Sequence, residues 1–182
     1  MPHDAALTAM RAALSDAATG FNAKLAALAP ARGIDPFEID WSDTSDNFIQ
    51  AFIDPAQIDV SEVMEFPACV IWASSPRQFP AGTRTIGPMF DGEVTGHVAF
   101  ALRHRPVKYS DIEAEGASAA KNLEKLRHAV IRAAMEAFHA VDEWPEGVGY
   151  HGLVATADYP FELTGDGWEA VVEMQFMFDV SI

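Results

Sequence analysis

The feature that most constrains the fold of this chain is an alternating segment near its C-terminal end, GWEAVVEMQFMFDVSI (residues 167–182). Every second residue from Trp168 to Val180 is apolar, and Glu169 and Glu173 are among the polar residues between them. A period of two residues is typical of a β-strand that buries one face and leaves the other face polar. We therefore expect a long strand here, with a core on one side and an acidic surface on the other.

Two earlier segments also predict strands. ACVIWAS (68–74) is a compact apolar run with β-branched and aromatic residues, which favours a strand buried on both faces. VTGHVAFALR (94–103) alternates instead, and this predicts a half-buried strand with Thr95, His97 and Arg103 on its polar face.

Weaker strand signals lie elsewhere in the chain. YHGLVATA (150–157) predicts a strand, and LTGDG (163–167) predicts a hairpin turn before the final strand, because Asp-Gly tolerates a positive φ. The short apolar runs FIQAFI (48–53) and VMEF (63–66) could each form a strand within a region that we expect to be extended and partly irregular.

Two segments predict helices. Residues 4–28 place apolar side chains three, four and seven positions apart, which predicts an amphipathic helix that Pro30 and Gly33 end. A second helix is predicted from Ser118 to Val141, after a match to a capping box at residues 110–113. Its buried stripe is expected to contain Leu123, Leu126, Val130, Ala134, Phe138 and Val141.

The predicted order is a helix, an extended region, strands, a long helix and further strands. Strands that follow one another in sequence, with helices grouped apart from them, favour an α+β fold. We expect a single, mainly antiparallel β-sheet packed against the long helix, with the N-terminal helix added to it. A length of 182 residues is typical of one domain, so we expect a single domain over residues 1–182.

Charge is distributed unevenly along the chain, whose formal net charge is −15. Residues 33–76 contain nine acidic residues and residues 133–182 contain ten, and neither block contains Lys or Arg. Residues 77–132 contain nine of the twelve basic residues. An acidic surface repels phosphate backbones, which disfavours a nucleic-acid groove. The separated blocks fit either an unevenly charged surface or a contact between the basic block of one copy and an acidic block of another.

A long loop or arm is predicted at about 75–93, where three prolines and three glycines lie within nineteen residues. It carries Arg77, Phe79 and Arg84. Long loops inside compact domains are uncommon and are usually functional or disordered. The segment is therefore either a surface loop or an arm that becomes ordered against a partner, and its apolar residues favour the arm.

The search for catalytic motifs is negative. The sequence contains no nucleophile elbow, phosphate-binding loop or dinucleotide-binding turn. Cys69 lies in an apolar run and is expected to be a core residue. Glu136 and His139 have the spacing of metal ligands on a helix, but the chain lacks the further sets of ligands that such a bundle needs. We therefore predict no catalytic residue, cofactor or metal. No run of about 18 apolar residues occurs, so no membrane-spanning segment is predicted.

Taken in order, these elements resemble the tail-terminator, or tail-completion, proteins of long-tailed bacteriophages. The resemblance lies in the layout: an N-terminal amphipathic helix, strands such as ACVIWAS and VTGHVAFALR, the long helix KNLEKLRHAVIRAAMEAF, a hairpin and the final strand WEAVVEMQFMFDV. It covers most of the chain and rests on no signature motif. The acidic stretch at 35–65 and the loop at 75–93 make this chain larger than a minimal member.

The resemblance implies a structural, non-enzymatic virion protein, assembled in the host cytoplasm. Six copies would form a ring that caps the tail tube and joins it to the head connector, and DNA would pass through the lumen without specific binding. The residues expected at its interfaces are Arg77, Phe79, Arg84, Arg103, Arg105, Lys108, Glu169 and Glu173.

Other functions remain open at this point. Neck and minor tail proteins use similar folds, and a small adaptor could add a strand to a partner. A small ligand-binding domain or enzyme is a third possibility, for which His97, Arg103 and His104 would be the expected site.

Overall fold

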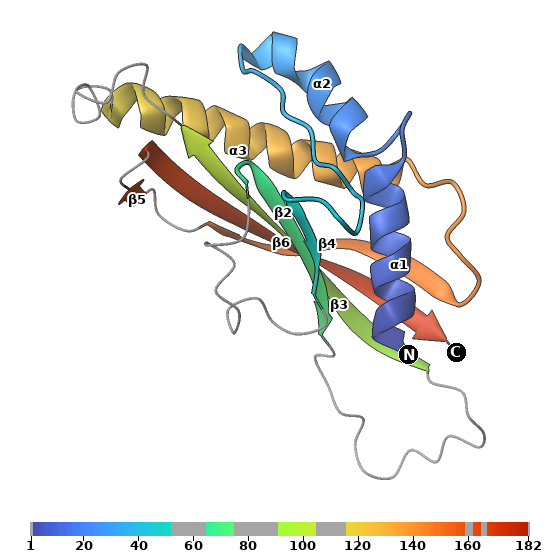
Figure 1. Cartoon of the computed structure of the whole chain (residues 1–182). Helices are drawn as coiled ribbons and strands as arrows, with labels where there is room; N and C mark the ends of the chain where they lie inside the picture. The colour runs from blue at the N-terminus through green and yellow to red at the C-terminus, as the bar shows by residue number, and fades with distance from the viewer. Residues whose placement is uncertain are drawn as a thin grey trace.

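The computed structural model describes residues 2–51, 65–74, 91–104, 116–158, 162–164 and 167–181. These residues form helices on one side of a β-sheet (Figure 1). The helices are α1 (Pro2–Ser15), α2 (Phe21–Arg32) and α3 (Gly116–His139). The strands are β1 (Phe48–Gln50), β2 (Ala68–Ser74), β3 (Asp91–His104), β4 (Val148–Asp158), β5 (Glu162–Thr164) and β6 (Gly167–Ser181).

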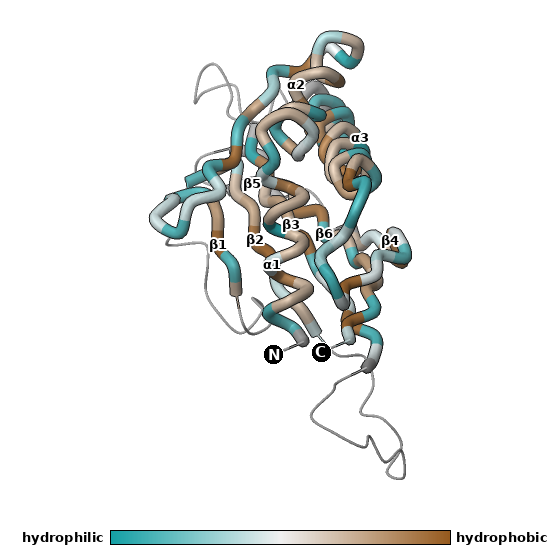
Figure 2. Tube along the Cα trace, turned by 90° about the vertical axis from the view of Figure 1, so that its right-hand side faces the viewer, coloured by the Kyte–Doolittle hydropathy of each residue, from teal (hydrophilic) through white to brown (hydrophobic). Residues whose placement is uncertain are grey.

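The sheet has the strand order β1-β2-β3-β6-β4, and β5 also pairs with β6. The strand labels in Figure 2 follow this order from left to right. Strands β1 and β2 are parallel, whereas the other neighbouring pairs are antiparallel. This arrangement confirms the predicted α+β class and the mainly antiparallel sheet.

The alternating C-terminal segment forms β6, which lies inside the sheet. One side of β6 pairs with β3 from Asp91↔Ser181 to His104↔Trp168, and the other side pairs with β4 and β5. Its backbone is therefore bonded on both sides. Among the described strands, β4 has β6 as its sole neighbour and forms an edge.

The core lies between the helices and one face of the sheet. The inward residues of β6 are at most 2% exposed, and they are Ala170, Val172, Met174, Phe176, Phe178 and Val180. From α3, the predicted stripe is buried at Leu123, Val130, Ala134 and Phe138, and partly buried at Leu126 and Val141. The periodicity therefore identified the inward faces of both elements correctly, although α3 ends at His139 rather than Val141.

The predicted helix over 4–28 is wrong in one respect, because the structure breaks it into α1 and α2. Asp16 Oδ1 accepts hydrogen bonds from the backbone N–H groups of Ala18 and Thr19, at 2.9 and 2.7 Å. An Asp side chain that bonds the following amides favours a turn over a continuous helix. Gly20 then packs so closely that an added Cβ would lie 2.4 Å from the Asp16 carbonyl oxygen.

The end of α2 also differs from the prediction, because Pro30 lies inside the helix. Proline removes one N–H donor, but its fixed φ is compatible with helix, and α2 continues to Arg32. Gly33 ends the helix with a left-handed φ of 61°. The next amide, Ile34 N–H, donates to Ala29 O at 3.3 Å.

The predicted strand boundaries hold best at β2, which matches 68–74. Strands β3 and β4 extend beyond the predicted 94–103 and 150–157, and β1 covers the start of 48–53. Thr164 pairs with Gly167 across the β5–β6 hairpin, as the Asp-Gly signal predicted. The capping box at 110–113 lies outside the described residues.

Candidate functional site on the helix-free face of the sheet

The face of the sheet opposite the helices carries a row of polar side chains, which we call the outward face. It follows from the alternation of β3 and β6, whose odd-numbered residues point away from the buried core. Its polar side chains on β2, β3 and β6 include Ser74, Glu93, Thr95, His97, Arg103, Glu169, Glu173, Gln175, Asp179 and Ser181.

Three of these side chains form a continuous hydrogen-bonded chain across β2, β3 and β6. Ser74 Oγ lies 2.8 Å from His97 Nε2, and His97 Nδ1 lies 2.9 Å from Glu173 Oε1. In register, Ser74 is opposite Thr95 and Glu173 is opposite Ala99, so each is a diagonal neighbour of His97. The side chains of His97 and Glu173 are only 12% and 13% exposed. The sheet register therefore brings together residues that are far apart in sequence.

The imidazole of His97 is held in place from two further sides. The Trp72 ring stacks on it, with the centroids 4.6 Å apart and the planes inclined by 11°. Gln175 Nε2 donates to Glu173 Oε1 at 3.2 Å, which orients the carboxylate that His97 contacts. A ring with a fixed plane and a fixed partner on each nitrogen has little freedom to rotate.

These contacts determine the roles of the two imidazole nitrogens. A carboxylate only accepts hydrogen bonds, so Nδ1 of His97 donates to Glu173. In the neutral ring, Nε2 is then the acceptor, and Ser74 Oγ–H donates to it. The arrangement can therefore pass a proton from the Ser74 hydroxyl to His97 while Glu173 stabilises the imidazolium.

Two further pairs of basic and acidic side chains connect strands on this face, and neither pair includes a serine. His151 Nε2 lies 2.6 Å from Asp179 Oδ2, with both side chains about half exposed. Arg103 forms an ion pair with Glu169 at 2.5 Å, and its guanidinium lies 3.9 Å from the centre of the Phe66 ring. The acidic residues of β6 therefore have basic partners on the neighbouring strands of the same chain.

Of the residues predicted at interfaces, Arg103, Glu169 and Glu173 lie on the outward face and are paired within the chain. The remaining five lie outside the described residues: Arg77, Phe79, Arg84, Arg105 and Lys108. The same holds for the predicted loop or arm at 75–93, apart from its last three residues, which belong to β3.

The predicted His97, Arg103 and His104 site is not supported as a single cluster. His97 and Arg103 are six positions apart on β3, which is about 20 Å along a strand. They contact different partners, Glu173 for His97 and Glu169 for Arg103. The sequence analysis named His97, and named Glu173 as an interface residue, but it missed Ser74 and the contact among the three, because the register between strands alone brings them together.

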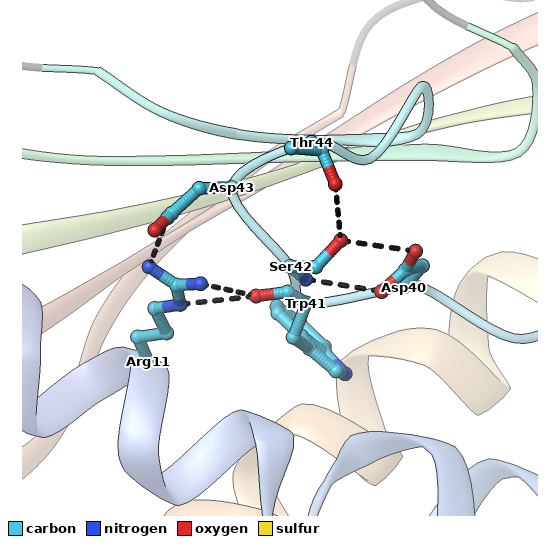
Figure 3. Close-up of polar contacts among 6 residues, drawn as sticks. All are labelled: Arg11, Asp40, Trp41, Ser42, Asp43 and Thr44. Carbon is cyan, nitrogen blue, oxygen red and sulfur yellow. Dashed lines mark hydrogen bonds and ion pairs between the residues drawn. The ribbon is translucent and has the colours of Figure 1, made fainter.

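Arg11 anchors the acidic segment that follows α2 (Figure 3). Its guanidinium donates to Trp41 O through Nε at 3.1 Å and pairs with Asp43 Oδ1 at 2.5 Å. The Asp40 carboxylate oxygen Oδ1, in turn, accepts a hydrogen bond from the backbone N–H of Ser42 at 3.0 Å. These contacts hold the segment against α1, which indicates a structural role for its acidic residues. Within the described ranges, no three His, Cys, Asp or Glu side chains come close enough together to hold a metal ion.

A cavity of about 260 Å³ lies between the end of α2 and α3. Its lining includes Asp35, Arg103 and Asn122 as polar residues. Arg103 already forms an ion pair with Glu169, so its charge is partly neutralised.

Two groups away from the outward face have shifted pKa values caused by burial. Cys69 is fully buried in β2, and desolvation raises the pKa of its thiol well above the usual value. This confirms the prediction that Cys69 is a core residue. Desolvation also raises the pKa of Tyr150 to about 12.

Comparison with known proteins adds no relative. The sequence matches no protein-family model, and a search of curated proteins gave no match. Among the described helices, none combines the length and the apolar character that crossing a membrane requires.

Proposed function

We propose that this chain is a structural virion protein, a tail terminator that forms a ring, caps the tail tube and joins it to the head connector. The observation that supports the proposal is the layout of the fold. An N-terminal helix and a long helix cover one face of a mainly antiparallel sheet, and a C-terminal hairpin supplies a central strand. This is the layout on which the resemblance to tail-terminator proteins rests.

Charge separation supports head-to-tail assembly, because a ring requires contact between two different surfaces. The exposed acidic residues of the described part of the chain include Asp35, Asp40 and Asp46, which lie in the segment after α2. Lys121 is an exposed cation on α3. Since the acids of β6 are paired within the chain, we expect the segment around 35–46, rather than β6, to meet the basic block of a neighbour.

Light scattering coupled to size-exclusion chromatography, with electron microscopy of the purified protein, tests this proposal. We expect closed rings, either of the protein alone or after addition of tail-tube or connector protein. A free terminator can be monomeric, so both conditions must be measured. A protein that stays monomeric and binds neither partner would overturn the proposal.

A strand-adding adaptor is the second candidate, and the position of β4 favours it. Within the described sheet, β4 pairs with β6 alone, and Val154 on it is 56% exposed. An edge strand offers backbone groups to an incoming strand. Amide hydrogen exchange separates the candidates: strand addition would protect residues 148–158, whereas a ring contact through the charged segments would leave their exchange unchanged.

A further inference from the structure

We propose that Ser74 is a nucleophile activated by His97 and Glu173, and that it accepts the acyl group of small carboxylic esters. The inference goes beyond the structural role proposed above and does not depend on it. It rests on the hydrogen-bonded chain from Ser74 Oγ through both nitrogens of His97 to Glu173, with steps of 2.8 and 2.9 Å.

The order in which the hydroxyl, the imidazole and the carboxylate are hydrogen-bonded is the main argument for a nucleophilic role. A nucleophilic serine needs a base within hydrogen-bond reach, and the base needs a third group that fixes its tautomer and orientation. Here the hydroxyl contacts Nε2 and the carboxylate contacts Nδ1, so one imidazole serves both partners. Such a site is recognised by geometry and roles, whatever the fold or the order along the chain.

The environment of the three groups also suits this role. His97 and Glu173 are largely removed from water, which strengthens their mutual interaction. Trp72 fixes the imidazole plane. Ser74 is only partly buried. By contrast, the His151–Asp179 pair on the same face is half exposed, and no hydroxyl contacts it within the described part of the chain.

The reaction that follows is hydrolysis of an ester in two steps. Ser74 Oγ attacks the carbonyl carbon, and its proton moves to His97 Nε2. The bond from the carbonyl carbon to the leaving oxygen then breaks, and His97 returns the proton to that oxygen, which releases an alcohol and leaves acyl-Ser74. Water attacks this ester with His97 as the base, the proton returns to Ser74 Oγ, and a carboxylic acid is released.

A fluorophosphonate probe and p-nitrophenyl acetate test the proposal on the full chain. Mass spectrometry of the intact protein and of its peptides should place one phosphonyl group on Ser74, and Ser74→Ala should abolish it. His97→Gln should slow both labelling and ester hydrolysis by at least about 100-fold, since it removes the base. Glu173→Gln should slow them by at least about tenfold, while circular dichroism stays unchanged.

Matched variants separate this site from general reactivity. Ser181→Ala removes an exposed serine of β6, and His151→Gln removes the histidine of the other His–carboxylate pair. Both should react like the wild type. Absence of a label on Ser74, or equal labelling of His97→Gln and wild type, would show that the three residues serve packing alone. If His97→Gln is unfolded, Ser74→Ala and Glu173→Gln still decide the matter.

Discussion

At the scale of single residues, Gly96 shows how closely α1 packs on the sheet. A Cβ added there would lie 2.3 Å from Met10 Sδ and 2.9 Å from Phe178 Cε2. Real Cβ atoms do not approach other heavy atoms this closely, so both side chains would have to move. The Met10 side chain of α1 therefore packs directly against the backbone of β3 at this point, and a larger residue would displace it.

We expect Gly96→Ala to lower the free energy of unfolding by about 1–3 kcal/mol, the usual cost of overpacking a core. Gly149→Ala is the matched control, because its Cβ would lie 3.7 Å from the nearest atom, on Asp179. The control should change stability by less than about 0.5 kcal/mol. Urea denaturation measures both variants, and a Gly96→Ala protein as stable as the wild type would contradict the packing described.

The hydroxyl group of Tyr150 is buried and removed from water. Its Oη has no hydrogen-bond partner among the described residues, and desolvation raises its pKa from 10.0 to about 12. Because the folded pKa exceeds the unfolded value, the unfolded chain loses this proton first as pH rises. The contribution to stability is therefore complete below pH 10 and is lost between about pH 10 and 12.

Tyr150→Phe should accordingly keep the stability at neutral pH or raise it by up to about 1 kcal/mol, since an unpaired buried hydroxyl is costly. The free energy of unfolding of this variant should also fall less steeply above pH 10 than that of the wild type, because the variant lacks the group that ionises there. Ultraviolet titration of the folded protein should show one tyrosine ionising near pH 12, absent from the variant. Ionisation of Tyr150 near pH 10 would contradict the burial.

At the scale of elements, the turn between α1 and α2 depends on Asp16. Hydrogen bonds from the backbone and side chain of Thr19, then from Ala18, hold the pKa of this carboxyl below its usual value of 3.8. A lowered folded pKa means that the ionised form stabilises the fold. That contribution is present above the unfolded pKa and is lost as pH falls through the folded pKa.

Asp16→Asn should therefore lower stability at neutral pH and weaken the loss of stability below about pH 4. Asp142→Asn is the control, because this exposed carboxylate has no hydrogen bond within the described part of the chain. Thermal unfolding followed by circular dichroism from pH 7 to about pH 2.5 measures both. Parallel curves for Asp16→Asn and wild type would show that the turn does not depend on the ionised side chain.

At the scale of the whole molecule, the charged residues of the described ranges include those paired across the sheet and those exposed in the segment after α2. The carboxylates on the outward side of β6 are paired with His97, Arg103 and His151 on neighbouring strands. The segment around 35–46 keeps several exposed acids, of which Asp43 is paired with Arg11. Assembly through charge should therefore involve this segment and the basic block, while reversing Arg103 would also break an ion pair inside the chain.

Arg84→Glu tests this account, and we expect it to weaken ring formation while the fold stays intact. Complementary charges guide such contacts and are screened by salt. The wild-type assembly should weaken at high salt, and the variant should respond less. Lys24→Glu, a reversal on α2 outside the basic block, is the matched control. Light scattering at low and high salt measures each, and equal assembly of wild type and Arg84→Glu at both would refute the electrostatic account.

The sequence predicted the parts of this fold that depend on local periodicity. The inward faces of β6 and α3 follow from alternation and from helical spacing, because burial repeats with the geometry of each element. The break at Asp16 was missed, since apolar spacing continues from Leu14 to Phe21 across it. There, side-chain hydrogen bonds to the backbone outweigh the periodic pattern.

What depends on pairing between strands could not be predicted. The central place of β6 follows from its partners, and a single sequence does not specify partners. The same is true of Ser74, His97 and Glu173, which are ordinary outward residues until β2, β3 and β6 are aligned. A register shifted by one residue would have turned His97 to the other face.

The central position of β6 also has a consequence for how the chain folds. The contacts between β3 and β6 join residues far apart in sequence, 66 positions for Arg103 and Glu169 and 76 for His97 and Glu173. Ribosomes make β3 well before β6, so the nascent chain carries the apolar face of β3 without the neighbour that completes it. The helices can form early from local contacts, whereas the sheet must close in a late step that is slow and exposed to aggregation.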